Sequence, residues 1–220
     1  MICWSDTSIC YAKQCARSDN EGRFILTAVW WEEKDDVCIL FDPSHAAQYA
    51  ALLRPTRAAP EGEVMSRDKR FSEEAASLGY GFDGEIKIGG NYVPLLRDGN
   101  HVYVSGQIPR VDNTVVVTGA AGTEVSLAQA QVAAKVCVMR ALALLKRSLG
   151  SLERVSAVPR ITVYVQSSQE FTQQSEVADG ASEVLFNVLG PAGAHTRTSV
   201  GVFKLPKNAT VEIDLVVTVE

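Results

Sequence analysis

The chain has 220 residues, of which 46% are hydrophobic and 21% are charged, and its formal net charge is −5. This composition supplies enough apolar material for a core and excludes a chain that is disordered throughout. No apolar run approaches the ~18 residues that a membrane-spanning helix needs. The acidic balance lacks the basic excess that binding to a phosphate backbone usually requires, so we expect neither a membrane nor a nucleic-acid partner.

The five cysteines are an odd number, and no secretory signal precedes them. This combination indicates free thiols in a reducing compartment. Asp6, Asp19 and Glu21 argue against a mitochondrial transit peptide, although they leave a mitochondrial location open. We therefore expect a cytoplasmic protein.

The character of the sequence changes near residue 70. All three tryptophans and four of the five cysteines lie before this point. In this part, Phe24–Trp31 and Val37–Phe41 look like strands and could pair as a hairpin, but they are too short to bury a core. We expect residues 1–70 to be an N-terminal extension of unknown role, either disordered or the result of a misassigned start upstream of Met65. Residues 71–220 would form one domain.

From residue 71 on, the first predicted elements are short. Phe71–Leu78 is typical of a helix. Two apolar runs, Tyr92–Arg97 and His101–Ser105, flank an Asp-Gly-Asn turn and predict a hairpin. The β-branched run Thr114–Thr118 predicts a third strand of the same sheet.

A long helix follows these strands. Ser126 with Gln129 three residues later forms a capping-box pattern, and Gly150 is a typical residue after a helix end. The remaining expected elements are a strand, a helix and two strands, over 161–165, 179–189, 199–203 and 211–219. The order predicts an α+β fold in which two helices pack on one face of a single mixed β-sheet.

Four local motifs occur together in the second part of the chain. They are Ser-Gly-Gln-Ile-Pro at 105–109, Asp-Gly-Ala-Ser at 179–182, His-Thr-Arg at 195–197, and Leu-Pro followed by Val-Glu-Ile at 205–213. In this combination, residues 72–220 resemble the Rid family, also called YjgF or endoribonuclease L-PSP. The resemblance implies a chorismate mutase-like fold and homotrimers with an active site at each subunit interface.

The resemblance also implies two catalytic residues. Arg197 matches the arginine that grips the substrate carboxylate, a role that suits a planar guanidinium with two parallel donors. Glu212 matches the glutamate that orients the attacking water, which requires a titratable group near the reacting carbon. Considered without the family, Arg197 could instead form a surface salt bridge, and Glu212 could be an outward-facing strand residue.

Three further residues match substrate-binding positions near the start of the domain. Gly106 would let its backbone N–H approach the substrate closely. Tyr92 lies 13 residues before Ser105, the spacing that the family shows for its active-site tyrosine and serine. The alternatives are a tight turn for Gly106, a half-buried strand aromatic for Tyr92, and a strand-end cap for Ser105.

Substrate-binding positions in the later motifs depart from the family pattern. Asp179 stands where relatives often have asparagine, and its carboxylate would repel a substrate carboxylate. Ser199 replaces a frequent cysteine, and Gly201 replaces a residue that is often larger or acidic. His195 could line the same pocket or face solvent from a loop.

The resemblance implies hydrolytic deamination of reactive 2-imino or 2-enamino acids to 2-oxo acids and ammonia. It implies a small carboxylate substrate and neither cofactor nor metal; the scattered histidines and cysteines also lack the spacing of a metal site. Two alternatives stay open. One is RNA cleavage, and the other is a non-catalytic trimer that binds small carboxylates or proteins. Chorismate mutase activity is the least expected, because a fold alone does not carry a function.

Overall fold

The computed structural model describes residues 13–18, 24–29, 65–84, 86 and 89–220. The chain divides into two units, the first ending at Gly62. In the first unit, β1 (Lys13–Ser18) pairs antiparallel with β2 (Phe24–Val29). The expected strand at Phe24 is present, and it pairs with β1, which was not predicted. Val37–Phe41 lie outside the described residues.

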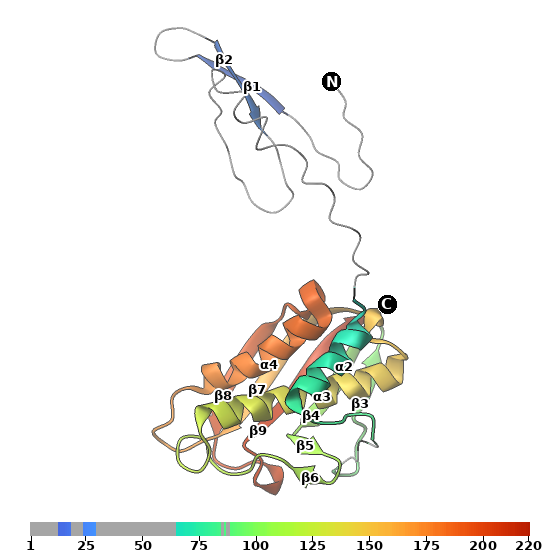
Figure 1. Cartoon of the computed structure of the whole chain (residues 1–220), viewed down its shortest axis with the longest axis vertical. Coiled ribbons are helices and arrows are strands. Elements are labelled where there is room, and N and C mark those ends of the chain that lie inside the picture. The colour runs from blue at the N-terminus through green and yellow to red at the C-terminus, as the bar shows by residue number, and fades with distance from the viewer. Residues whose placement is uncertain (1–12, 19–23, 30–64, 85, 87–88) are drawn as a thin grey trace. The chain divides into compact units, whose positions relative to one another are not determined.

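The second unit is built on a five-stranded sheet in the order β3-β4-β9-β7-β8 (Figure 1). Only β7 and β8 run parallel, so the sheet is mixed, as expected. The bounds of the five strands are β3 (Leu95–Asp98), β4 (His101–Gln107), β7 (Val155–Gln166), β8 (Thr196–Val202) and β9 (Val211–Val219).

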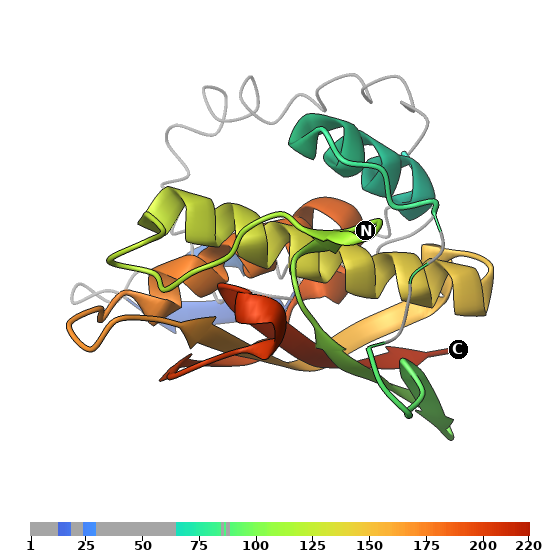
Figure 2. The same ribbon diagram turned by 90° about the horizontal axis from the view of Figure 1, so that it is seen from below.

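Two helices, α3 (Leu127–Leu149) and α4 (Gln174–Leu189), lie on one face of this sheet (Figure 2). A third, α2 (Arg67–Leu78), packs against both of them and forms an outer layer. The predicted α+β fold with two helices on one face is therefore confirmed, and α2 adds a layer above it. Because α2 begins at Arg67, it crosses the boundary that we expected between residues 70 and 71.

The core lies between the sheet and the α3–α4 layer. Most of α3 is buried there, and so are alternate residues of β9. The buried β9 residues are Val211, Ile213, Leu215, Val217 and Val219. Both capping-box hydrogen bonds between Ser126 and Gln129 are present, and Gly150 ends α3 with a φ of 85°. Among the described helices, α3 alone is long and apolar enough to cross a membrane, but 67% of its apolar stretch is buried in this fold.

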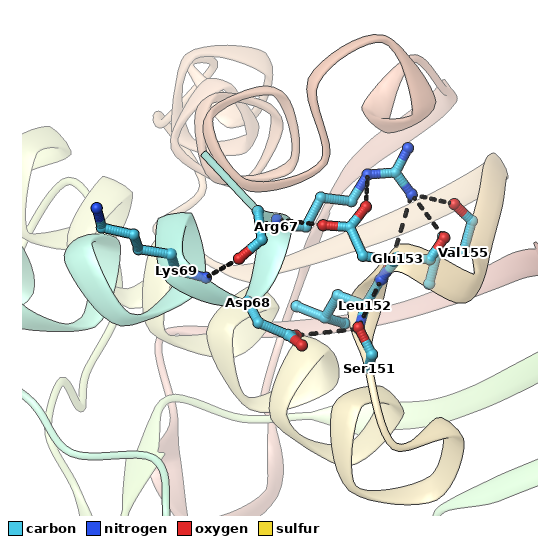
Figure 3. Close-up of polar contacts among 8 residues, drawn as sticks. Arg67, Asp68, Lys69, Ser151, Leu152, Glu153 and Val155 are labelled. Carbon is cyan, nitrogen blue, oxygen red and sulfur yellow. Dashed lines mark hydrogen bonds and ion pairs between the residues drawn. The ribbon is translucent and has the colours of Figure 1, made fainter. Parts of the chain in front are cut away.

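Polar contacts attach the start of α2 to the segment that follows α3 (Figure 3). The Arg67 guanidinium donates to the carbonyl oxygens of Leu152, Glu153 and Val155 and lies 3.6 Å from the Glu153 carboxylate. The Leu152 backbone N–H, at the start of η2 (Leu152–Arg154), donates to Asp68 at 3.0 Å. These contacts make α2 an integral part of the second unit.

The third strand predicted over Thr114–Thr118 is wrong as a strand of the main sheet. Thr114–Val115 form β6, which pairs with β5 (Arg110–Val111) in a separate hairpin closed by Asp112 with a φ of 51°. A place beside β4 was not open to this run, because β4 already pairs with β3 on one edge and with β9 on the other.

Candidate active site

The side chain of Glu212 on β9 lies directly against Gly106 on β4. The two strands pair in register up to Val104 and again at Gln107, with an irregularity between these residues that places Gly106 beside the Glu212 carboxylate. A Cβ atom at position 106 would lie 2.9 Å from the Glu212 Cδ and closer still to its Oε1. Glycine at position 106 is thus needed to keep the Glu212 carboxylate in this position, since any larger residue would displace it.

The environment of Glu212 favours its protonated form. Glu212 is half-buried, and this burial raises its pKa; the charge of Asp214, two residues further on the same strand face, raises the pKa further. Tyr164, the β7 residue opposite Glu212, also has a raised pKa, from burial and then from the charge of Asp214. A raised pKa makes the ionised carboxylate a stronger base, which suits a group that accepts and returns a proton.

Ser105 and Tyr92 meet at the same end of the sheet. The Ser105 hydroxyl donates to the Val93 carbonyl oxygen at 2.8 Å, and the Ser105 N–H donates to the Pro94 carbonyl oxygen at 2.9 Å. Tyr92 therefore lies in a loop held by Ser105, before β3 and not within a strand as predicted. Its side chain is 52% exposed and lies beside Gly90.

A pocket of about 220 Å³ opens at this end of the sheet and contains both Tyr92 and Glu212. Its remaining wall includes apolar residues of the neighbouring loops and three cationic side chains, Arg110, Arg140 and Lys207. These three cations were not predicted from the sequence. A signal for Arg140 was available, because it is the one charged residue in an otherwise apolar stretch of the long helix, from Val136 to Leu145.

Arg197 lies elsewhere, between β8 and α4. Its Nη1 donates to Asp179 and to the Ser182 hydroxyl, both at 2.9 Å, and its Nη2 donates to the hydroxyl and carbonyl oxygens of Ser175. The Asp179 carboxylate, expected to repel a substrate, instead forms an ion pair with Arg197. Ser199 is on the same side of β8 as Arg197, two residues along the strand.

His195 belongs to the network of Arg197 and is not a solvent-facing loop residue. Its Nδ1 lies 2.6 Å from the Gly193 carbonyl oxygen, and its Nε2 lies 2.9 Å from the Ser182 hydroxyl. Because a carbonyl oxygen only accepts, Nδ1 donates to Gly193, and Nε2 forms the hydrogen bond with the Ser182 hydroxyl. Ser182 therefore connects His195 to Arg197.

The two predicted catalytic residues lie on opposite faces of the sheet. In the strand register, Glu212 is opposite Tyr164, whereas Arg197 is opposite Ile161, which is buried under the helices. Side chains alternate along β7, so Ile161 and Tyr164 point to different faces. The predicted site residues of one chain thus fall into two separate groups: Tyr92, Ser105, Gly106 and Glu212 in one, and Asp179, Arg197 and Ser199 in the other.

A family model described as "YjgF/chorismate_mutase-like, putative endoribonuclease" matches residues 76–218. The chain belongs to the YjgF/chorismate mutase-like family. This family membership confirms the predicted resemblance.

Three proteins that are similar to this chain share most of their own length with it. Protein TCP17 of Trypanosoma cruzi is 40% identical over 128 residues, which cover 58% of this chain and 80% of that protein. A protein of Dermatophagoides farinae named 2-iminobutanoate/2-iminopropanoate deaminase is 30% identical over 132 residues, covering 60% of this chain and 88% of that protein. Atu1372 of Agrobacterium tumefaciens, a protein described as of unknown function, is 37% identical to this chain. Its crystal structure matches with a TM-score of 0.63, and the match covers 70% of this chain and 95% of Atu1372.

The described part of this YjgF-family chain holds no group of three histidine, cysteine or acidic side chains that could bind a metal ion. Cys137, which is the cysteine of the long helix, is fully buried and unbridged, with its Sγ beside the Val211 carbonyl oxygen. Burial raises the pKa of this thiol well above its usual value. Cys137 therefore serves as a small core residue and not as a nucleophile.

Proposed function

We propose that this protein hydrolyses 2-imino and 2-enamino acids to 2-oxo acids and ammonia. The observation that carries the proposal is the half-buried Glu212, which lies against Gly106 in a pocket and has a raised pKa. The deaminase name of the Dermatophagoides farinae relative, at 30% identity, supports the same chemistry.

In this reaction, ionised Glu212 accepts a proton from a water molecule while the water oxygen attacks the imine carbon. The proton is passed to the imine nitrogen, which gives a carbinolamine. Glu212 then takes the hydroxyl proton and passes it to the same nitrogen as the carbon–nitrogen bond breaks, so that ammonia leaves and the carbonyl forms. Imines of this kind also hydrolyse in water without a catalyst, so the protein need supply only positioning and one acid/base group. Tyr92 and the Gly106 N–H would position the substrate beside Glu212.

The substrate carboxylate would be bound by Arg197, whose guanidinium can form two parallel hydrogen bonds to it. Since Arg197 and Glu212 lie on opposite faces of one sheet, we propose that a complete site forms between two copies. A homotrimer, as the family resemblance implies, would repeat this site three times in a closed ring. The uncovered sheet face, which carries the exposed Tyr103 and Val200, is available for such contacts.

Ammonia release from 2-iminobutanoate, generated in the assay by an amino acid oxidase, tests the proposal. The native protein should raise the rate above the spontaneous one, and Glu212→Gln should lose at least ~10²-fold of this acceleration. Asp214→Asn is the matched control, because it removes an acid from the same strand face two residues away. Equal loss in both variants, or none in Glu212→Gln, would contradict the role of Glu212. A protein that binds 2-oxobutanoate but gives no acceleration would be a binding module.

A further inference from the structure

Two arginines in the pocket of Glu212 have donors that the fold does not use. Arg140 comes from α3 and is only 5% exposed. Its Nη1 donates to the Arg110 carbonyl oxygen at 2.7 Å, but its Nε is buried and has no hydrogen-bond partner among the described residues. In the same part of the chain, the buried Nε of Arg110 also has no partner.

The charges of this pair are also unbalanced. No described acidic side chain lies within ion-pair distance of Arg110 or Arg140, and Lys207 adds a third cation to the same pocket. Burial, together with the charge of Arg110, lowers the pKa of Arg140, so the surroundings disfavour the charged form of this side chain. Burying an arginine beside a second cation is costly unless an anion binds there.

A purely structural role would not account for this arrangement. The contact between Arg140 and the Arg110 carbonyl oxygen uses one donor of a guanidinium that has five. An uncharged residue of similar length could supply that single hydrogen bond without a buried charge. Both arginines line a pocket that also contains Glu212, the proposed acid/base group.

We propose that Arg110 and Arg140 form a subsite for a second acidic group of the substrate. This inference rests on the proposed function, in which Arg197 binds the carboxylate next to the imine carbon. A monocarboxylic imine such as 2-iminobutanoate has no other group to offer these arginines. The substrate class would therefore be imines or enamines of amino acids with an acidic side chain, whose second carboxylate can accept from both guanidiniums.

Binding of two stable 2-oxo acids to the full-length protein, measured by calorimetry, tests the subsite. 2-Oxoglutarate carries the second carboxylate, and 2-oxopentanoate has the same carbon chain without it. We expect 2-oxoglutarate to bind at least ~10-fold more tightly, as charge-assisted hydrogen bonds in a desolvated pocket predict. Arg140→Met and Arg110→Gln should each bring the ratio of the two dissociation constants close to one. Arg97→Gln, at an exposed arginine on β3, should keep the native ratio.

Arg110→Gln keeps the test valid should Arg140→Met fail to fold, because Arg110 lies on a surface hairpin and not in the core helix. A native ratio near one, or a native ratio retained by either folded variant, would overturn the subsite. Ammonia release separates this result from the proposed function. Acceleration with 2-iminobutanoate and no preference for 2-oxoglutarate would reject the subsite alone. The preference without any acceleration would support the subsite and reject deamination.

Discussion

Replacing Gly106 by alanine is a sharp test of the candidate site, because it adds one carbon atom beside Glu212. The Cβ would lie 2.9 Å from the Glu212 Cδ and 3.1 Å from its Cγ, and closer still to Oε1. Normal contacts between carbon atoms are about 3.5–4.0 Å. The carboxylate must therefore move by roughly an ångström from the position that it holds in the native protein.

The effect on activity should exceed the effect on stability. The clash involves the end of a flexible side chain, and the φ of Gly106 is not positive, so alanine fits the backbone without strain. We expect a loss of stability of about 1 kcal/mol or less, which is typical of modest substitutions. A displacement of about 1 Å for a catalytic group can cost ~10²-fold in rate. Gly106→Ala should thus approach the loss expected for Glu212→Gln.

Steady-state ammonia release and thermal melts on both variants and on their double variant would measure these effects. If Gly106→Ala acts by moving Glu212, the double variant should be little worse than Glu212→Gln alone, since the two changes affect one group. Gly106→Ala with activity within about threefold of native would refute the reasoning, as would fully additive losses.

Three further predictions concern pH, the arginine and the chain start. Asp214 raises the pKa of Glu212, so Asp214→Asn should lower this pKa and move the acid limb of the pH–rate profile to lower pH, measured as kcat/KM against pH. Burial would still keep the pKa above its usual value. Arg197→Ala should lower kcat/KM by at least ~10-fold, and Arg197→Lys should restore little because an ammonium lacks the two-pronged geometry; melts serve as the folding control. The chain starting at Met65 should fold with the native melting temperature, whereas one starting at Phe71 should melt lower because it loses the contacts of Arg67; equal melting temperatures would contradict the role of α2.

The elements with strong local signals could be predicted from the sequence. The strict alternation of β9 and the capping box at Ser126 depend on residues close in the chain, and both occur as expected. The run Thr114–Thr118 shows the limit of such reasoning. Its β-branched residues favour an extended backbone, but local patterns do not encode which strands pair, and Thr114–Val115 pair with β5 in a separate hairpin.

The candidate site was predictable in its residue types but not in its geometry. Motifs placed Gly106 and Glu212 near the reaction, yet their direct contact depends on an irregularity in the β4–β9 pairing that local patterns do not encode. The same is true of Arg140, which reaches the pocket only because α3 packs over this end of the sheet. Its isolated charge in an apolar helix indicated an unusual position but not its neighbour Arg110.

Because Arg197 and Glu212 lie on opposite faces of the sheet, a mixture of two variant chains, each lacking one of these residues, should recover activity. Arg197→Ala leaves the group of Glu212 intact, and Glu212→Gln leaves the group of Arg197 intact. In the proposed closed ring of three chains, every mixed assembly contains one junction at which both intact groups meet. Random reassembly of equal amounts should therefore restore about a quarter of the native activity, although each parent alone is strongly impaired. Through such complementation, an allele that lacks one of the two residues would partly compensate for an allele that lacks the other.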